Sequence, residues 1–202
     1  MRIGIFGGSF DPVHYGHLLM AEHAREQLRL DEVRFLPAAT APHKQHREIA
    51  SAEDRVEMLK LAIAGHVPFT VDTREIDRGG LSYTVDTLRE LHDEDDSREL
   101  FLLLGGDSLA DLPGWREPEQ ICRLSTPAAI ARVGFERLAF EALEPLVEPE
   151  RMEAIKNCVV QMPLIELSST EIRRRVGAGE SIRFQTPRAV EQYVLLQELY
   201  AS

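Results

Sequence analysis

The chain of 202 residues is long enough for one domain, and a folded chain of this length buries roughly 70% of the surface that its unfolded form exposes. Its composition, 44% hydrophobic and 28% charged, is that of an ordinary globular protein and excludes collagen-like, low-complexity and mainly disordered classes. The net charge of −11 disfavours a nucleic acid or an anionic membrane as the main partner.

Short apolar runs alternate with helical patterns along the chain. Strands are expected at residues 2–6, 33–36, 69–72 and 100–104, with two further candidates at 128–131 and 159–165. Helices are expected at residues 17–30, 51–64, 83–92 and 187–200, with Ser51 as a helix N-cap. Residues 135–157 give no clear pattern. The alternation predicts an α/β fold with a doubly wound parallel sheet.

No internal repeat or linker divides the chain, so we expect a single domain over residues 1–202, with residues 167–202 as a small C-terminal helical subregion. Ligands of parallel sheets bind beyond the carboxyl ends of the strands, where loops meet helix N-termini. Chemistry is therefore expected after residues 6, 36, 104 and 131.

The cysteine content and the apolar segments predict a location. Cys122 and Cys158 form neither a disulfide framework nor a metal-ligand spacing, which favours a reducing compartment. The N-terminal apolar run is too short for the core of a signal peptide, and no stretch approaches the length of a membrane span. We therefore expect a cytoplasmic protein without a membrane partner. Its oligomeric state stays open, with a homo-oligomer as one option.

The turn after the first expected strand carries two histidines, and it reads Gly7-Gly8-Ser9-Phe10-Asp11-Pro12-Val13-His14-Tyr15-Gly16-His17. Glycines let backbone N–H groups approach a phosphate, and the positive end of a following helix favours an anion. On a helix, His14 and His17 would point the same way and could bind phosphate oxygens. The alternative for His17 is a structural core histidine. The turn is neither a dinucleotide fingerprint nor a Walker loop, which argues against a hydride-transferring oxidoreductase.

This turn resembles the H-x-G-H signature of the nucleotidyltransferase superfamily, in the form Gly8-x-Phe10-Asp11-Pro12-x-His14-x-Gly16-His17. The resemblance implies a Rossmann-like fold and transfer of a nucleotidyl group from a triphosphate, with Mg²⁺ bound through the ATP phosphates and no covalent enzyme intermediate. It implies a catalytic role for His14 and His17. It also places ATP against Gly7, Gly8, Ser9 and Phe10.

A second motif, Leu167-Ser168-Ser169-Thr170-Glu171-Ile172-Arg173, lies near the other end of the chain. By itself it is typical of a helix start, with Ser168 or Ser169 as the cap and a solvated basic face behind it. It also resembles the Ile-Ser-x-Thr-x-x-Arg stretch with which the superfamily closes over the ATP phosphates. This resemblance implies ATP contacts for Ser168, Ser169 and Thr170, and a catalytic role for Arg173, whose guanidinium suits phosphate.

Further matches are to the family with nicotinate mononucleotide adenylyltransferase activity. The loop Pro42-His43-Lys44 is similar to the family's loop that holds phosphates in line, which implies acceptor contacts for Lys44 and His43. Thr84, at a helix start, would receive the nicotinate carboxylate. Arg132 is usable, although the family's Arg-Pro-Gly is Arg132-Val133-Gly134 here.

The loop after the fourth strand offers a glycine-flanked carboxylate and the chain's single tryptophan. A flat aromatic in such a loop is suited to stacking a planar heterocycle, and packing of the loop is the alternative. By resemblance, Trp115 stacks the acceptor's pyridine ring and Asp107 contacts its sugar, while Gly105 and Asp107 also border ATP.

The motifs together predict an enzyme that transfers the adenylyl group of ATP to nicotinate mononucleotide, giving nicotinate adenine dinucleotide and pyrophosphate in NAD biosynthesis. No dedicated metal site is expected in the protein. Two alternatives remain at this point: pantetheine phosphate as the acceptor, and a nucleotide-binding protein of the same fold without turnover.

Overall fold

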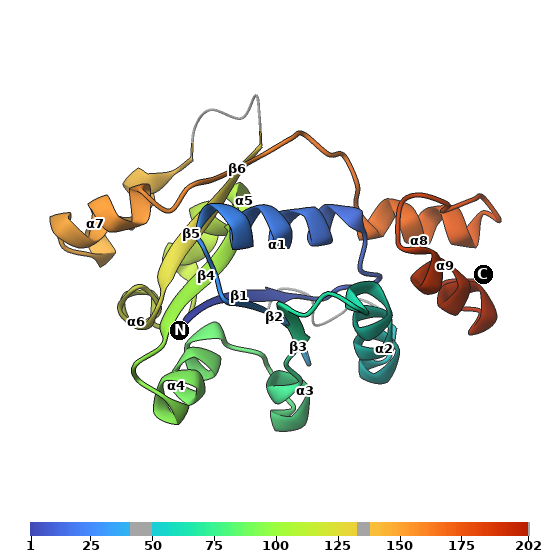
Figure 1. Cartoon of the computed structure of the whole chain (residues 1–202), viewed down its shortest axis with the longest axis horizontal. Coiled ribbons are helices and arrows are strands. Elements are labelled where there is room, and N and C mark those ends of the chain that lie inside the picture. Colours follow the sequence, from blue (N-terminus) through green and yellow to red (C-terminus); the bar gives the residue numbers. More distant parts are fainter. Residues whose placement is uncertain (41–49, 133–137, 202) are drawn as a thin grey trace.

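The computed structural model describes residues 1–40, 50–132 and 138–201 (Figure 1). In this part of the chain the strands are β1 (Arg2–Gly8), β2 (Glu32–Pro37), β3 (Phe69–Val71), β4 (Glu99–Gly105), β5 (Thr126–Arg132) and β6 (Val160–Met162). The α-helices are α1 (Tyr15–Gln27), α2 (Ala52–Ile63), α3 (Arg74–Arg78), α4 (Thr84–Glu94), α5 (Gly106–Asp111), α6 (Pro118–Leu124), α7 (Pro149–Lys156), α8 (Ser169–Gly177) and α9 (Arg188–Leu196). The described residues also form the 3₁₀ helices η2 (Leu112–Gly114) and η3 (Phe140–Leu146).

The strands form one sheet in the order β3-β2-β1-β4-β5-β6, and every neighbouring pair is parallel. The chain first moves outward from β1 to β3, then returns to the other side of β1 with β4, so the strand order reverses between β1 and β4. A reversal of this kind opens a crevice at the carboxyl ends of the strands. The prediction of a doubly wound parallel α/β sheet is confirmed.

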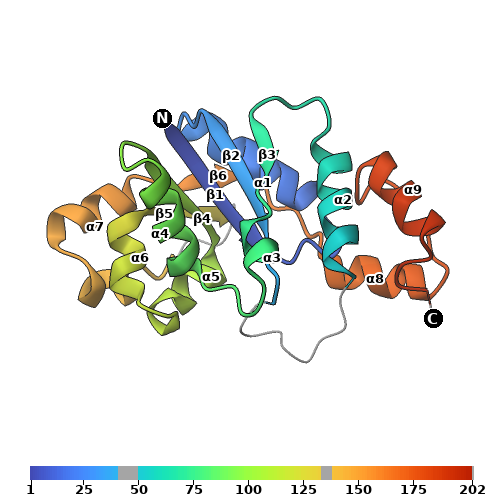
Figure 2. The same cartoon turned by 90° about the horizontal axis from the view of Figure 1, so that it is seen from below.

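The sheet is buried on both faces, as its central strand β4 illustrates. Leu100, Leu102 and Leu104 belong to the core cluster that includes α4, α5, α6 and α7. Phe101 and Leu103, which alternate with them, belong to the cluster that includes α1, α2, α8 and α9. Successive side chains of a strand point to opposite faces, so a continuous apolar run is what a doubly covered strand requires. Figures 1 and 2 show α1 and α4 on opposite faces of the sheet.

The C-terminal helices share the core of the first cluster. Ile172 of α8 and Val190 and Val194 of α9 are fully buried within it, and α9 packs against α2. Residues near the end of the chain are thereby carried to the carboxyl end of β1. No helix in the described ranges has the length and apolar character that crossing a membrane would require.

Several boundaries differ from the sequence-based expectations. The strand expected at 159–165 is limited to Val160–Met162. The expected last helix ends at Leu196, because Glu198 and Tyr200 both have a positive φ, which a right-handed helix cannot continue. The segment without a clear pattern contains η3 and α7, and α3, α5 and α6 were not expected. These helices have five to eight residues, too few turns for an apolar periodicity to develop.

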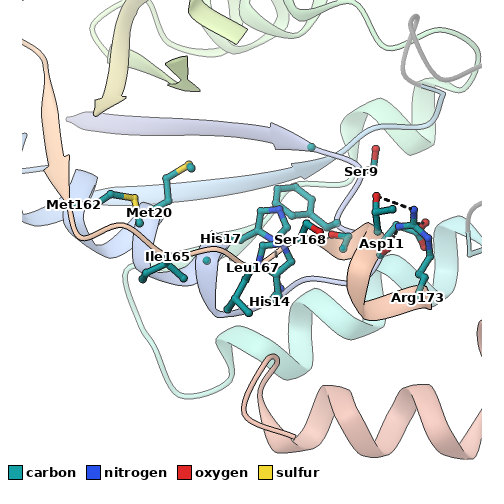
Figure 3. A pocket seen from close by; sticks show the side chains of 15 residues that line it. Ser9, Asp11, His14, His17, Met20, Met162, Ile165, Leu167, Ser168 and Arg173 are labelled. Carbon is teal, nitrogen blue, oxygen red and sulfur yellow. Dashed lines mark hydrogen bonds and ion pairs between the residues drawn. The ribbon is translucent and has the colours of Figure 1, made fainter. Parts of the chain in front are cut away.

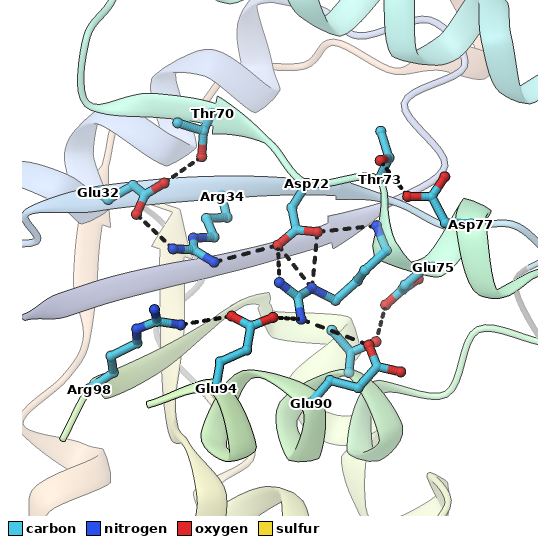
Figure 4. A network of polar contacts seen from close by, with 12 residues as sticks. Glu32, Arg34, Thr70, Asp72, Thr73, Glu75, Asp77, Glu90, Glu94 and Arg98 are labelled. Atoms are coloured by element: carbon cyan, nitrogen blue, oxygen red, sulfur yellow. Dashed lines mark hydrogen bonds and ion pairs between the residues drawn. The ribbon is translucent and has the colours of Figure 1, made fainter. Parts of the chain in front are cut away.

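A polar network joins β2, β3, α3 and α4 (Figure 4). Arg74 donates to both oxygens of Asp72 and to Glu94, and Glu94 also accepts from Arg98. Arg34 binds Glu32 and lies 3.6 Å from Asp72. The charges of this region therefore compensate one another.

Candidate active site

A cavity of about 330 Å³ lies at the carboxyl end of β1, between the turn that follows this strand and the start of α8 (Figure 3). Its polar part joins the two predicted motifs, although about 150 residues separate them in sequence. The described residues that line it are Gly8, Ser9, Phe10, Asp11, His14, Gly16, His17, Met20, Met162, Ile165, Leu167, Ser168, Ser169, Thr170 and Arg173. Figure 3 shows Met20 and Met162 at one end and Asp11 and Arg173 at the other.

The turn between β1 and α1 is shaped by close packing. A Cβ on Gly16 would lie 3.0 Å from the His14 ring, so this position accepts only glycine unless the ring moves. Phe10 is fully buried with a φ of +50°, and its ring lies edge-on to His17, with the ring centroids 5.1 Å apart. The Phe10 ring thus restricts the position of the His17 ring.

His14 and His17 lie face to face at the start of α1. The helix expected at residues 17–30 begins two residues earlier, at Tyr15, and His14 is its N-cap, with extended backbone dihedrals. The two rings still stack, with centroids 3.7 Å apart. His17 Nδ1 accepts a hydrogen bond from the His14 backbone N–H at 3.3 Å. This acceptor role keeps the proton of a neutral His17 on Nε2, where it is a donor.

His14 is a buried polar side chain with unmet hydrogen-bonding capacity. Only 6% of the residue is exposed, and its Nδ1 has no hydrogen-bond partner among the residues that the structure describes. Burial lowers the pKa of His14 to about 4, so its imidazole is neutral at pH 7. Buried polar atoms are nearly always paired in native proteins, so an exception that lines a cavity calls for an explanation, and a bound ligand that supplies the partner is one.

The first turn of α8 adds hydroxyl groups and a cation to the same cavity. The Ser168 hydroxyl caps the helix by accepting from the Glu171 N–H at 3.2 Å, as the sequence predicted. The Ser169 hydroxyl donates to the carbonyl of Pro12 at 2.9 Å. Arg173 donates to the backbone carbonyl of Asp11 and lies 3.3 Å from its Oδ2. The helix start is therefore attached directly to the histidine turn.

Other C-terminal residues hold the same turn. The buried hydroxyl of Thr186 donates to the Val13 carbonyl at 2.8 Å, and the Tyr15 N–H donates to the Gln185 carbonyl at 3.1 Å. The Tyr200 hydroxyl donates to Asp11 Oδ1 at 2.8 Å. The position of the histidines thus depends on the last part of the chain.

Arg55 is a buried cation beside the turn that the sequence analysis did not single out. Its guanidinium, 1% exposed, donates to the carbonyls of Ser9, Ala38 and Ala50 at 2.8–3.2 Å. Burial lowers its pKa, and the charge of Asp11 acts in the opposite direction. Arg55 thus connects the histidine turn to the residues on either side of the 41–49 segment.

Some predicted acceptor residues cannot be placed with the cavity. Lys44 and His43 lie outside the described residues, as does the side chain of Arg132, whose backbone ends β5. Thr84 is the first residue of α4. Near it, Ser82 accepts from the Ala39 N–H at 2.9 Å and donates its own N–H to the Thr40 carbonyl, so the residues before the 41–49 segment lie beside the start of α4.

The loop after β4 is described, and it borders a different part of the molecule. Gly105 is the N-cap of α5, Asp107 lies in the first turn of this helix, and Trp115 follows η2. Trp115 is half-buried and packs against the cluster under α4, α5 and α6, as the alternative interpretation of a packed loop predicted. Gly7, Gly105 and Asp107 are not among the residues that line the cavity.

Three polar residues near the cavity were missed as site residues: Asp11, Arg55 and Tyr200. A signal existed for Arg55, because it occupies an apolar position of its helix, with Met58, Leu59 and Ile63 as the other buried residues of α2. The sequence gives no comparable signal for the contact between Asp11 and Tyr200, which are 189 residues apart.

The described residues contain no cluster of three or more His, Cys, Asp or Glu side chains with the geometry of a metal site. The carboxylate that lines the cavity, Asp11, already binds Tyr200 and Ala50 through one oxygen and faces Arg173 with the other. Asp11 is thus already compensated by its partners, and the described residues that line the cavity offer no second carboxylate to a divalent cation.

Comparisons with known proteins identify the family of this chain. The cytidylyltransferase-like family model matches residues 5–175. The chain is 46% identical over 200 residues to a probable nicotinate-nucleotide adenylyltransferase of Thermus thermophilus, covering 99% of this chain and 100% of the relative. It is 43% identical over 198 residues to one of Rhodopirellula baltica, covering 98% of this chain and 92% of the relative.

Solved structures show the same fold. A Plasmodium falciparum nicotinic acid mononucleotide adenylyltransferase, complexed with APC, superimposes with a TM-score of 0.75 at 17% identity, covering 98% of this chain and 96% of the other. Its complex with NaAD gives a TM-score of 0.74. At this identity the likeness concerns the fold alone. Through its sequence relatives, the chain belongs to the nicotinate-nucleotide adenylyltransferases of the cytidylyltransferase-like family.

Proposed function

We propose that the cavity between the histidine turn and α8 is where this chain transfers the adenylyl group of ATP to nicotinate mononucleotide. The products are nicotinate adenine dinucleotide and pyrophosphate, in NAD biosynthesis. The observation that carries the proposal is the meeting of two stacked histidines with the Ser-x-Thr-x-x-Arg helix start in one cavity. Membership of the nicotinate-nucleotide adenylyltransferases identifies the acceptor.

The reaction needs positioning and charge stabilisation more than proton transfer. An oxygen of the mononucleotide's phosphate attacks the α-phosphorus of ATP, and the bond from this phosphorus to the oxygen of the β-phosphate breaks. The electron pair of that bond leaves with pyrophosphate. Because the attacking phosphate is already ionised at pH 7, no side chain has to remove a proton, and catalysis depends on in-line alignment.

The residues of the cavity suit this task. His17, with its proton on Nε2, donates to a phosphate oxygen of ATP, and His14 gains in the same phosphate the partner that its Nδ1 lacks. Arg173 and the hydroxyls of Ser168 and Thr170 bind the departing pyrophosphate at the positive end of α8. Gly7, Gly8, Ser9 and Phe10 border ATP on the strand side.

For the acceptor we propose the residues at the neighbouring strand ends. Lys44 and His43 hold the mononucleotide's phosphate in line, and Thr84 at the start of α4 receives the nicotinate carboxylate. Trp115 stacks the pyridine ring. Asp107 contacts the ribose and, with Gly105, borders ATP, while Arg132 adds a cation from the end of β5. The contacts of Ser82 with Ala39 and Thr40 support this grouping, because they bring the residues before Lys44 next to α4.

We further propose that Mg²⁺ enters with ATP, bound through its phosphates, where it neutralises charge on the nucleotide. This is consistent with the lack of a ligand cluster in the described residues. A cytoplasmic location follows from the reducing compartment that the cysteine content predicts. Self-association into a homo-oligomer is compatible with this site and is checked by light scattering of the purified protein.

Pyrophosphate release from ATP with each of three acceptors tests the proposal. Nicotinate mononucleotide should support turnover, and nicotinamide mononucleotide and pantetheine phosphate should support much less. Turnover with pantetheine phosphate alone would identify the other acceptor class. Release with none of the three, in a protein that still binds ATP, would identify a nucleotide-binding protein without turnover.

The role of Trp115 has a direct readout, because it is the only tryptophan of the chain. Adding nicotinate mononucleotide should change its fluorescence, and adding ATP alone should change it little. Trp115→Ala should weaken acceptor binding by roughly 1–3 kcal/mol, as for a lost aromatic stack on a heterocycle, and leave ATP affinity nearly unchanged. An emission change with ATP and none with the mononucleotide would overturn the stacking role.

A further inference from the structure

The carboxylate of Asp11 occupies a buried position, where a negative charge is unfavourable unless partners compensate it. It is 1% exposed and lines the cavity that we assign to a triphosphate. Burial of a charge requires compensation from partners, and proximity to a polyanion adds repulsion. The contacts that compensate this charge are therefore the first place to look for its role.

The two oxygens of this carboxylate have separate partners. Oδ1 accepts from the Tyr200 hydroxyl at 2.8 Å and from the Ala50 N–H at 3.0 Å. Oδ2 makes no hydrogen bond within the described ranges, and Arg173 Nη1 lies 3.3 Å from it. Two donors on one oxygen fix the plane of the carboxylate, and this plane turns Oδ2 towards Arg173. Figure 3 shows the two side chains joined at one end of the cavity.

Arg173 requires a fixed partner if its guanidinium is to keep one orientation. Its long side chain has many rotamers in solution, and the structure holds it with 16% exposure beside Thr170, which lies 3.4 Å from its Nη2. Attachment of Nη1 to Asp11 leaves the guanidinium edge that carries Nη2 on the side of the α8 hydroxyls. A cation oriented before the substrate arrives loses less entropy when phosphate binds.

We infer that Asp11 is a positioning residue that orients Arg173 towards the departing pyrophosphate, and that the Tyr200 hydroxyl sets the orientation of Asp11. Through this relay, Tyr200 near the end of the chain controls the position of the Arg173 guanidinium. It deepens the proposed function, because it rests on the role of Arg173 in ATP binding.

The chain contains a matched control for Tyr200. Tyr193 of α9 donates its hydroxyl to Asp54 Oδ1 at 2.9 Å, a bond of the same kind and length that does not reach the cavity. Tyr200→Phe and Tyr193→Phe each remove one oxygen atom. Both should lower the melting temperature slightly, by about 2–4 °C. Tyr200→Phe alone should weaken binding of a non-hydrolysable ATP analogue, by roughly tenfold in Kd, since the lost bond is to a charged group.

Arg173 and Arg174 give the second comparison. Arg174, on the same helix, is paired with Glu171 and Glu180 and is half exposed, so Arg174→Ala should change the Kd little. Arg173→Ala should raise it roughly tenfold or more. Because Tyr200 acts through Arg173, the Tyr200→Phe/Arg173→Ala double variant should bind the analogue within about twofold of Arg173→Ala. Asp11→Asn, which keeps an oxygen for Tyr200 but removes the charge, should raise the Kd less than Arg173→Ala, because Arg173 keeps its hydrogen bond to the backbone carbonyl of this residue.

Equal losses of affinity in Tyr200→Phe and Tyr193→Phe would overturn the inference, because both would then report general stability. The inference would also be overturned if the fold-losses of affinity of Tyr200→Phe and Arg173→Ala multiplied in the double variant. Calorimetry with the ATP analogue requires no acceptor. A failure of the proposed function, seen as no pyrophosphate release by the wild-type protein, is therefore distinguishable from a failure of the relay.

Discussion

The polar network of β2, β3, α3 and α4 and the cavity at the end of β1 use similar side chains in opposite ways. In the network, Arg74 meets Asp72 and Glu94 at 2.7–3.0 Å, and Glu94 also binds Arg98 (Figure 4). In the cavity, by contrast, His14 Nδ1 is buried without a hydrogen bond among the described residues.

This difference separates a structural cluster from the cavity that we propose as the active site. Satisfied charges stabilise the fold and leave nothing for a ligand, whereas buried polar atoms without a partner cost free energy until a ligand arrives. Four substitutions, from the largest expected effect to the smallest, test whether the distinction holds.

Arg55→Met should have the largest effect, on stability. It removes the hydrogen bonds to the partly buried carbonyls of Ser9, Ala38 and Ala50 and takes away a buried cation near Asp11, so we expect a loss of about 3–5 kcal/mol in the free energy of unfolding. Denaturation by urea measures it. A loss below about 1 kcal/mol would mean that water reaches these carbonyls and replaces the guanidinium as their hydrogen-bond donor.

His17→Ala should retain the fold and lower turnover by about 10² or more, on the order of 3 kcal/mol, as expected when a preorganised donor to the transition state is lost. Pyrophosphate release at saturating substrates measures turnover, and circular dichroism checks the fold. Turnover within a few-fold of wild type would show that His17 is a core histidine that packs against Phe10.

The buried His14 predicts a pH dependence of stability. Its pKa is about 4 in the folded chain and 6.5 in the unfolded chain, so between these values the unfolded state binds the extra proton. Stability should therefore fall as pH decreases from about 6.5 to about 4, by up to about 3 kcal/mol from this group. Urea titrations of the wild type and of His14→Asn measure it. Parallel curves for the two proteins would show that His14 is not buried neutral.

Arg74→Met should affect stability modestly and activity not at all. It removes the shared partner of Asp72 and Glu94, which are partly exposed, so we expect a loss of about 1–2 kcal/mol. The Michaelis constants for ATP and for the acceptor should stay within about twofold of wild type. A selective rise in either constant would contradict the assignment of this network to structure alone.

The sequence predicted the features that depend on neighbouring residues. The apolar run of β4 indicated a strand covered on both faces, and the Ser51 cap was placed correctly. The motifs at His14–His17 and Ser168–Arg173, which were both predicted to contact ATP, line one cavity. Strand periodicity, caps and glycine turns are local, so a single sequence contains them. The sequence did not predict η3 and α7 within residues 135–157, because these helices are too short to show an apolar periodicity.

The sequence by itself therefore determined the alternation of strands with the longer helices, the family and the two motifs that we propose to bind phosphate. Only the tertiary structure decided that His14 caps α1 and is neutral, that Arg55 is buried, and that Asp11 faces Tyr200 and Arg173. These properties arise from burial and from hydrogen bonds between residues as far as 189 positions apart. No local pattern encodes such pairings, because they exist only once the sheet and both layers of helices have packed.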